Sequence, residues 1–410
     1  MKKQKKIGRI CLCISVLLWM PLAVFASGPD IIASEDDLMF SKESAQLVSQ
    51  TVSASAPPEI SAQCAFVMEI GGTVLYEKNA DTRMSPASTT KIMTALTVMK
   101  TCDTLDSPVK IPAEAVGVEG SSIYLYENEE LTLRQLLYAM LMESANDAAT
   151  AIACFSAGDV SAFAQQMNET AQALSLTDTH FMNPHGLYHE EHYTTARELA
   201  KITCEALQLE DFRKMVSTYK MEIPLKGNEG VRLLVNHNRL LKSLNGCIGV
   251  KTGYTKKSGR CLVSAVERDG CTLICVTLNA PDDWNDHTAL TAWGFDQVEH
   301  VVLSEVGEQY TVLPVVGGKT DAADGSAMAA VRNEEALSAT LLKKGQNIRK
   351  TIILPHFLYA PVQAGDIVGH VIYYNNNVEI GRLTLYACES VDVYQKPTLW
   401  ERIQTIFRKK

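Results

Sequence analysis

The chain has 410 residues, of which 46% are hydrophobic and 21% are charged, and its formal net charge is −9. This composition is ordinary for a globular protein, and the length leaves room for one large domain and one smaller domain. The acidic balance argues against a protein that binds nucleic acid.

The first 26 residues have the three parts of a secretory signal peptide. A basic stretch is followed by an apolar run over residues 10–25, and Val24 and Ala26 place small residues at positions −3 and −1 of a cut after Ala26. An uncleaved membrane anchor is the alternative. Either reading predicts an exported protein. Cleavage would remove five basic groups and no acidic ones, so the net charge would fall from −9 to −14.

A linker and a hairpin follow the signal peptide. Residues 27–58 are rich in Ser, Ala and acidic side chains and end in Pro57-Pro58, which predicts a linker. We expect one large domain over residues 59–305. A hairpin over residues 64–77, with its turn at Gly71-Gly72, opens this domain.

A mostly helical block over residues 86–215 is expected to begin at Ser85-Pro86, because Ser is a common N-cap and Pro is favoured at the first helical position. Ser88 then lies in the first turn, where its N–H has no intrahelical acceptor. Lys91 follows one turn later on the same face. A serine hydroxyl is a weak nucleophile until a base takes its proton, and lysine is such a base only when neutral. Burial and a second cation, for which Lys251 is the candidate, would lower its pKa. A plain surface turn is the alternative.

Two buried helices are expected over residues 133–142 and 147–154, and Ser144 and Asn146 lie in the loop between them. Because both flanking helices are packed, the loop would hold its side chains in fixed positions. Ser144 would there relay a proton to a leaving group, and Asn146 would hold a substrate amide. Capping of the loop by these two side chains is the alternative.

Four histidines, His180, His185, His189 and His192, lie within 13 residues, with two glutamates between them. Imidazole and carboxylate groups are zinc ligands, so a metal site is one reading. Their spacing does not match the H-E-x-x-H pattern, in which two histidines share one helix face. We therefore predict neither a metal nor another cofactor.

Three strands are expected over residues 248–254, 260–267 and 271–279, the last two joined by the turn Arg268-Asp269-Gly270. A helical block inserted between strands that must pair predicts an α+β domain with an antiparallel sheet.

The first of these strands carries Lys251-Thr252-Gly253. Gly253 lets a substrate backbone approach closely, so an extended peptide could add along this strand. Lys251 and the Thr252 hydroxyl would then face a terminal carboxylate. The N–H groups of Tyr254 and Ser88 would form an oxyanion hole, a feature of acyl-transfer enzymes. An ordinary strand that ends in a turn is the alternative.

A separate small β domain is expected over residues 306–395, where short β-like runs alternate with turns such as Gly317-Gly318. Residues 396–410 place apolar side chains on one helical face, with basic side chains around them: Leu399, Ile403, Ile406 and Phe407. A basic amphipathic helix of this kind is typical of an anchor at a membrane surface. A helix packed on its own domain is the alternative.

Nine cysteines remain beyond the signal peptide, scattered and without C-x-x-C spacing. This arrangement favours neither a zinc site nor a redox motif. We expect mainly buried apolar thiols, with one or two disulfides as the alternative.

Three motifs occur in a characteristic order: Ser88-Thr89-Thr90-Lys91, Ser144-Ala145-Asn146 and Lys251-Thr252-Gly253. Further segments extend the pattern: Pro184-His185-Gly186-Leu187, residues 195–200, 251–255, 360–365 and 379–381, and the amphipathic tail. On these segments the chain resembles the serine-type D-alanyl-D-alanine carboxypeptidases, the low-molecular-mass penicillin-binding proteins, over nearly its whole mature length.

The resemblance implies a β-lactamase/transpeptidase-like catalytic domain, a small all-β domain and a C-terminal amphipathic helix at the outer face of the bacterial cytoplasmic membrane. It implies that a peptidoglycan stem peptide acylates Ser88, that the last D-alanine leaves, and that water hydrolyses the acyl-enzyme. β-Lactams would acylate the same serine. It makes Lys91 the base, while Ser144 and Asn146 form the second motif, and Lys251, Thr252 and Gly253 the third.

The chain departs from the family pattern at two positions. Asn236-His237-Asn238-Arg239 matches a segment in which some members carry Arg at the position of His237 and use it to bind a carboxylate. Here that role falls to His237, to Arg239 or to neither. Ile248 stands where an Asp often precedes the third motif, and we expect it to alter a structural contact rather than the chemistry.

Two other functions remain open from the sequence. A class A β-lactamase would need a placed glutamate to activate the deacylating water, and no loop offers a convincing candidate. A penicillin-binding sensor or scaffold without turnover is the second, and intact motifs argue against it.

Overall fold

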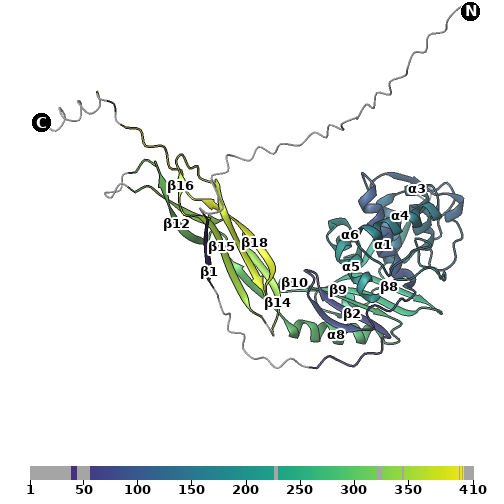
Figure 1. Ribbon diagram of the computed structural model, residues 1–410. Helices are drawn as coiled ribbons and strands as arrows, with labels where there is room; N and C mark the ends of the chain where they lie inside the picture. Colours follow the sequence, from purple (N-terminus) through teal and green to yellow (C-terminus); the bar gives the residue numbers. More distant parts are fainter. Residues whose placement is uncertain are drawn as a thin grey trace, which may run out of the picture.

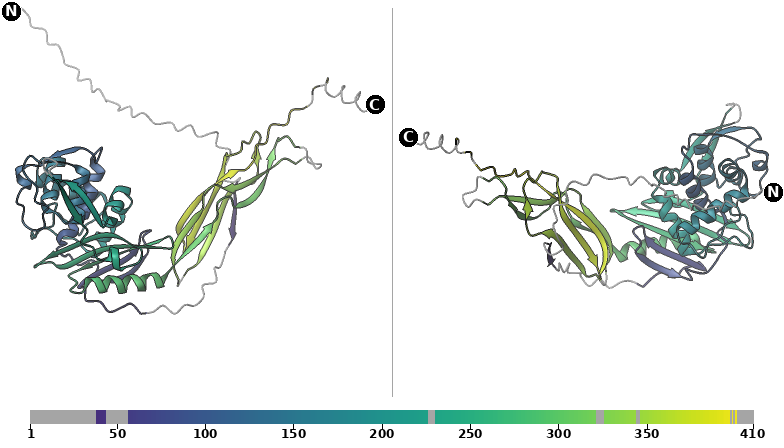
Figure 2. Two further views of the ribbon diagram at one scale, coloured as in Figure 1. Left: turned by 180° about the vertical axis from the view of Figure 1, so that it is seen from behind. Right: turned by 45° about the horizontal axis from the view of Figure 1, so that its top comes forward.

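The computed structural model describes residues 38–43, 56–225, 230–320, 326–343, 346–396, 398 and 400 (Figure 1). Two domains follow one another along the chain, and Figures 1 and 2 show them joined near α8 (Asp283–Gln297), with an angle between their long axes. The predicted signal peptide and most of the segment 396–410 lie outside the described residues. Within the described ranges, no helix combines the length and the apolar character that a bilayer span requires.

The N-terminal domain is built on a five-stranded antiparallel sheet with the order β3-β2-β10-β9-β8. Its strands are β2 (Cys64–Glu69), β3 (Val74–Lys78), β8 (Cys247–Thr255), β9 (Gly259–Arg268) and β10 (Cys271–Leu278). The predicted hairpin and the three later strands are confirmed. Strand β8 lies at the edge of the sheet, so one side of its backbone is open to a further strand.

The sheet is buried on both faces. On β2, Cys64, Phe66 and Met68 belong to the main core under the helices, while Ala65 and Val67 pack on the α8 side. Alternate side chains of a strand point to opposite faces, so a run of six buried residues requires cover on both.

The helical block covers the face opposite α8. Its helices are α1 (Lys91–Thr101), α2 (Leu133–Met142), α3 (Asn146–Ala157), α4 (Val160–Ala173), α5 (Ala196–Leu207) and α6 (Glu210–Ser217). Shorter elements connect them: η2 (Ala87–Thr90), η3 (Ala113–Ala115), β4 (Pro108–Lys110), β5 (Glu130–Thr132), β6 (Lys220–Pro224), β7 (Val231–Val235) and α7 (Leu240–Ser243).

The C-terminal domain is all β and has its own core, which includes Leu313, Val331 and Leu385. Its main sheet has the order β1-β15-β17-β18-β13-β12-β16, and β11 pairs with β14 separately. The strands are β1 (Leu38–Glu43), β11 (Val298–Ser304), β12 (Gln309–Val316), β13 (Met328–Asn333), β14 (Leu337–Leu342), β15 (Ile348–Pro355), β16 (Leu358–Tyr359), β17 (Ile367–Asn375) and β18 (Val378–Ala387).

Two of these strands lie outside the predicted β domain. Strand β11 precedes residue 305 but pairs with β14, and β1 lies inside the predicted linker but pairs with β15 and forms one edge of the main sheet. Both strands owe their place to partners far along the chain, which local composition does not reveal. The nine cysteines beyond the predicted signal peptide are free thiols, buried or half-buried, in line with the main reading of the sequence.

Candidate active site

Ser88 lies in a single 3-10 turn, η2, that leads into α1. Pro86 occupies the N-cap position of this turn, and the α-helix itself begins at Lys91. The expected N-cap at Ser85 is wrong, because the Ser85 hydroxyl accepts a hydrogen bond from the Ser258 hydroxyl at 2.8 Å and caps no backbone N–H. The turn between β8 and β9 thus engages Ser85, and the α-helix begins after the nucleophile rather than before it.

The Lys91 amine is the centre of the site. Its Nζ lies 3.0 Å from Ser88 Oγ, 2.7 Å from Asn146 Oδ1 and 2.7 Å from the backbone oxygen of His185. The last two are carbonyl oxygens, which only accept hydrogen bonds. A neutral amine has two N–H groups and one lone pair. If its two N–H groups serve the carbonyls, the lone pair is directed at the Ser88 hydroxyl, as a base requires.

The surroundings favour that neutral amine. Lys91 is 0% exposed and Lys251 is 1% exposed. Burial, followed by the nearby Lys251 cation, holds the pKa of Lys91 well below its usual range, although Asp147 acts in the opposite direction. Burial also lowers the pKa of Lys251, to about 7, and Glu143 opposes this. These shifts favour the uncharged amine at Lys91, while Lys251, whose pKa is about 7, still carries part of its charge near neutral pH.

A glycine from a distant loop supports the turn that carries Ser88. Gly186 has a φ of +84°, and a Cβ there would lie 1.9 Å from the backbone oxygen of Ala87. Ala87 itself has a φ of +48°, a conformation that its surroundings must hold in place. The same loop supplies the His185 carbonyl to Lys91. This loop therefore fixes both the nucleophile and its base.

Ser144 lies between α2 and α3, as the sequence predicts, whereas Asn146 is the first residue of α3 rather than a loop residue. Ser144 is 5% exposed and has a φ of +61°. The Asn146 side chain accepts from Lys91 and donates from Nδ2 to the Glu119 backbone oxygen at 2.6 Å. An amide group has a second lone pair and a second N–H, so a substrate amide would have to share Asn146 with these two partners.

The neighbouring Asp147, which the sequence analysis did not select, holds one wall of the site. Its carboxylate accepts from the Ser122 hydroxyl at 2.6 Å and from the N–H groups of Ile123 and Leu125 at 3.2 and 3.1 Å. These bonds fix the loop that presents Ser121 to the substrate side. The signal was present in the sequence as a carboxylate in the first turn of α3.

The third motif faces Ser88 from β8. A Cβ on Gly253 would lie 3.1 Å from the backbone nitrogen of Ser88, so glycine permits the strand to approach this closely. Lys251 and Gly253 alternate with Thr252 and Tyr254 along the strand. Thr252 and Tyr254 line the open side, and Lys251 Nζ donates to the Thr252 backbone oxygen at 3.0 Å.

A cleft of about 500 Å³ joins these parts. Twelve residues line it: Ser88, Ser121, Ser144, Asn236, His237, Arg239, Thr252, Gly253, Tyr254, Arg260, Asp283 and Trp284. Lys91, Asn146 and Lys251 lie directly beneath. The structure therefore brings all the sequence-predicted site residues to one place, although they come from four separate segments of the chain.

Basic and aromatic groups form one end of the cleft. The guanidinium groups of Arg239 and Arg260 lie 6.0 and 5.7 Å from the ring centroid of Trp284. Arg260 also pairs with Asp283, at 2.9 Å. Arg239 is a residue that the sequence predicts for the site, whereas Arg260, Asp283 and Trp284 are not. Arg260 is the cross-strand partner of Tyr254, a relation that the register of the β8–β9 hairpin makes visible.

The histidines of the loop have structural partners. His192 Nδ1 accepts from the N–H of Met182, so Nε2 carries the proton and donates to the Thr90 hydroxyl at 2.9 Å. Burial lowers the pKa of both His185 and His192 to about 3. Within the described ranges, no group of three or more His, Cys, Asp or Glu side chains is placed to hold a metal ion.

Comparison with known proteins agrees with this geometry. Residues 50–282 match the D-alanyl-D-alanine carboxypeptidase family, and residues 302–393 match the C-terminal domain of penicillin-binding protein 5. The chain belongs to the D-alanyl-D-alanine carboxypeptidase family. It is 34% identical over 312 residues to D-alanyl-D-alanine carboxypeptidase DacF of Bacillus subtilis, which covers 73% of this chain and 78% of that protein.

Solved structures of relatives share the fold of this family member. Penicillin-binding protein 5 from Haemophilus influenzae superposes with a TM-score of 0.61 at 27% identity, over 82% of this chain and 99% of that chain. A Streptomyces DD-transpeptidase superposes with a TM-score of 0.57 at 35% identity, over 59% of this chain and all of that chain. Family members are serine peptidases, so a nucleophilic serine is part of the enzyme class. Membership argues against a class A β-lactamase.

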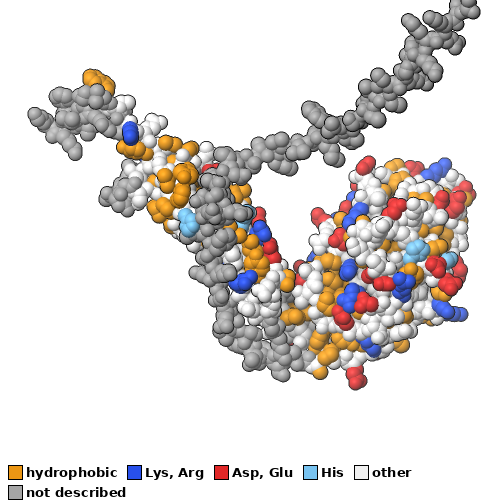
Figure 3. Space-filling view, in the orientation of Figure 1, with side chains coloured by type: hydrophobic (Ala, Val, Ile, Leu, Met, Phe, Trp, Pro, Cys, Tyr) orange, Lys and Arg blue, Asp and Glu red, His pale blue; other side chains and the backbone are white. Residues whose placement is uncertain are grey.

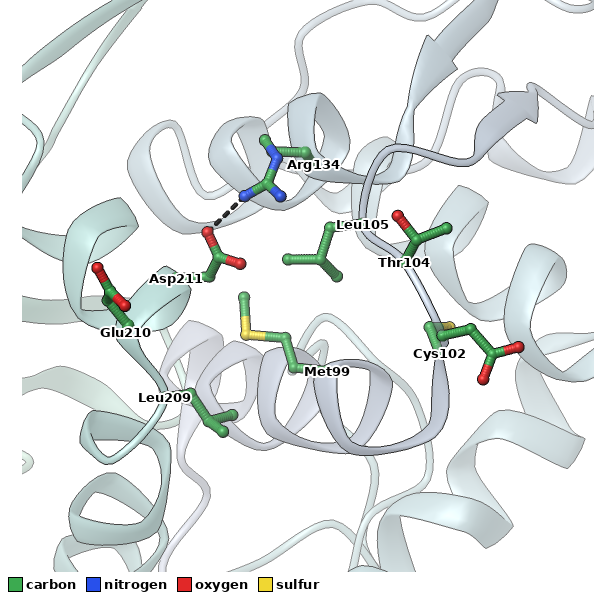
Figure 4. Close-up of a pocket in the computed structure, with 9 residues that line it drawn as sticks. Met99, Cys102, Thr104, Leu105, Arg134, Leu209, Glu210 and Asp211 are labelled. Atoms are coloured by element: carbon green, nitrogen blue, oxygen red, sulfur yellow. Dashed lines mark hydrogen bonds and ion pairs between the residues drawn. The ribbon is translucent and has the colours of Figure 1, made fainter.

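A second cavity of this carboxypeptidase-family member, of about 380 Å³, lies apart from the Ser88 cleft, between α1, α2 and α6 (Figure 4). Met99, Leu105 and Leu209 form its apolar lining, and Arg134 reaches across it to Asp211. It contains no base paired with a nucleophile. We regard it as a gap between helices that the Arg134–Asp211 ion pair bridges.

Proposed function

We propose that the protein is a serine DD-carboxypeptidase that removes the terminal D-alanine from peptidoglycan stem pentapeptides through an acyl-enzyme on Ser88. The observation that carries this proposal is the 3.0 Å approach of Ser88 Oγ to a buried amine whose other two hydrogen bonds go to carbonyl oxygens. A base held in this way is available to take a proton at neutral pH.

Acylation would proceed in balanced steps. The Lys91 lone pair takes the proton of the Ser88 hydroxyl while Oγ attacks the carbonyl carbon of the penultimate D-alanine. The N–H groups of Ser88 and Tyr254 stabilise the resulting oxyanion. The C–N bond then breaks as Ser144 passes its hydroxyl proton to the amine of the departing D-alanine, and the Lys91 ammonium returns its proton to Ser144. Water attacks the ester while Lys91 takes one of the water protons, and the shortened peptide leaves as that proton returns to Ser88 Oγ.

The substrate would lie along the open edge of β8. A peptide in extended conformation pairs with such an edge through its backbone. The Lys251 cation and the Thr252 hydroxyl would face the terminal carboxylate, and Asn146 would share its amide with the peptide. His237 and Arg239 line the same cleft, and the Arg239 guanidinium adds positive charge there. The same geometry fits a β-lactam, whose carboxylate and strained amide would occupy equivalent positions.

Measurement of D-alanine released from a muramyl-type pentapeptide by the purified protein tests this proposal. We expect Ser88→Ala to abolish both release and covalent labelling by fluorescent penicillin. Labelling without release in the wild type would indicate a sensor or scaffold, and rapid turnover of penicillin would indicate a β-lactamase. Addition of an amine acceptor separates hydrolysis from transfer, since one structural relative is a DD-transpeptidase. A Ser88→Ala protein that still labels covalently would exclude Ser88 as the nucleophile.

We further propose that the protein is exported and that residues 396–410 hold it at the outer surface of the cytoplasmic membrane. The end of the C-terminal domain from which this segment leaves supports the proposal. Exposed aromatic and apolar side chains gather there, including Val316, Tyr359 and Tyr394, and Figure 3 shows hydrophobic side chains at this end. Aromatic side chains next to basic ones are typical of membrane interfaces.

Deletion of residues 396–410 tests the membrane proposal. We expect the shortened protein to lose binding to phosphatidylglycerol vesicles and to keep its carboxypeptidase rate in solution. Equal binding of the full and shortened proteins would exclude the segment as the anchor.

A further inference from the structure

Glu143 ends helix α2 and directly precedes Ser144. None of the three motifs includes it. Its backbone N–H donates to the Ala139 oxygen at 3.1 Å, which fixes it as the C-cap of the helix, and its side chain is 24% exposed. A carboxylate at this position lies next to the cleft and acts on the buried Lys251.

The Glu143 carboxylate connects two walls of the cleft. One oxygen accepts from the Val235 N–H at 2.5 Å, at the end of β7, and the other lies 3.0 Å from His237 Nε2. In return, the N–H of His237 donates to the Met142 oxygen at 3.3 Å. Ser144 and His237, both of which line the cleft, are therefore held in register by a single side chain.

The same carboxylate acts on the charge of the third motif. Lys251 is buried, and within the described ranges its ammonium has one hydrogen-bond partner, the backbone oxygen of Thr252. Glu143 acts on Lys251, and the groups that act on Lys91 besides Lys251 are Asp147, His185 and His192. Glu143 is the anion that opposes loss of the Lys251 proton, and the Lys251 cation in turn lowers the pKa of Lys91.

We propose that Glu143 is a positioning residue for acylation: it holds the His237 segment against the Ser144 loop and supplies negative charge on the Lys251 side of the cleft. This rests on the proposed function. Glu143 acts on Lys251, whereas the hydrogen-bond partners of Lys91 are Ser88, Asn146 and the His185 backbone oxygen.

The pH profile of the second-order rate of acylation by fluorescent penicillin tests the electrostatic part. In the wild type we expect the rate to fall as pH rises through about 7, where Lys251 loses its proton. Glu143→Gln keeps the shape but removes the charge, so the pKa of Lys251 falls and the falling limb moves to lower pH, by about half a unit to one unit. Glu130→Gln makes the same change of net charge at an exposed position and should leave the limb in place.

Two further variants test the positioning part. Glu143→Asp keeps the charge, but its side chain is one methylene too short to reach both the Val235 N–H and His237. The falling limb of its pH profile should therefore stay in place, while kcat/KM for the pentapeptide falls about tenfold. His237→Gln keeps the Glu143 charge, so its limb should not move to lower pH. A Glu143→Gln limb that coincides with the wild type refutes the electrostatic part, and a Glu143→Asp protein with wild-type kcat/KM refutes the positioning part. If Glu143→Gln fails to fold, the kcat/KM of Glu143→Asp still decides whether Glu143 is a positioning residue. Either failure leaves the proposed function intact, because that depends on the Ser88→Ala result.

Discussion

Gly186→Ala adds one methyl group and changes no functional group, yet we expect it to disable the active site. The new Cβ would lie 1.9 Å from the Ala87 oxygen and 2.8 Å from the Thr90 hydroxyl. To restore ordinary contact distances, the Ala87–Ser88 turn must move by about 1 Å. A displacement of this size at reacting groups typically costs about 100-fold in rate.

The cost in stability has two parts. An alanine in the left-handed region costs about 1–2 kcal/mol, and forced overpacking adds about 1–3 kcal/mol. Gly158 provides a matched control, because its φ is +90° and nothing lies within 4 Å of its Cβ position. It ends helix α3, whose first residue is Asn146, so it is remote from the reacting atoms. Gly158→Ala should therefore show the cost of a left-handed alanine and not the cost of overpacking.

Rates of labelling by fluorescent penicillin and urea unfolding curves for both variants test this reasoning. We expect Gly186→Ala to unfold with about 2–5 kcal/mol less free energy than the wild type and to be acylated about 100-fold more slowly. Gly158→Ala should lose only about 1–2 kcal/mol and keep the wild-type rate. A Gly186→Ala protein that is acylated at the wild-type rate would refute the claim that this glycine fixes the nucleophile.

Three further outcomes are expected. Lys91→Ala should slow acylation by about 10²–10⁴-fold. Lys100 lies on the same helix but is half-exposed, so Lys100→Ala should leave the acylation rate unchanged. Equal acylation rates for the two variants would exclude Lys91 as the base. Arg232→Met leaves the buried Glu129 carboxylate without its partner and should cost about 3–5 kcal/mol in urea unfolding, part of which Glu129→Gln in the same chain should restore. Three buried histidines have pKa values of about 3 in the fold against 6.5 when unfolded: His185, His192 and His287. Because the unfolded chain binds more protons between these two pH values, the free energy of unfolding should fall as pH drops from 6.5 toward 3. A urea midpoint that is equal at pH 7 and pH 5 would contradict this.

Local patterns predicted the parts of the fold that depend on neighbours in the sequence. The strands around Lys251 and the hairpin at Gly71-Gly72 follow from alternation and turn residues, and the helices on either side of Ser144 follow from apolar runs. The three motifs could be placed on these elements, and the structure confirms that they meet.

Helix α8 shows why other parts could not be predicted. Four of its buried residues are polar, and three of these have partners from other segments of the chain. Asp283 pairs with Arg260, Asp286 accepts from Ser61 and Ala62, and His287 bonds to Ser264 and Thr277. Such a helix lacks the apolar stripe by which helices are recognised. The roles of Asp147 and Glu143 are hidden for the same reason, because their partners lie in segments that only tertiary structure brings near.

The pairing of β2 with β10 places Cys64 opposite Leu278. Asp286 then ties the backbone of Ser61 and Ala62 to α8. The two ends of the N-terminal domain thus meet in the middle of its sheet. Contacts between residues so far apart in sequence slow folding, because a long loop must close before they form. A ribosome must therefore synthesise almost the whole domain before its centre can assemble, and a fragment that stops short of β10 would leave β2 without the neighbour on which its burial depends.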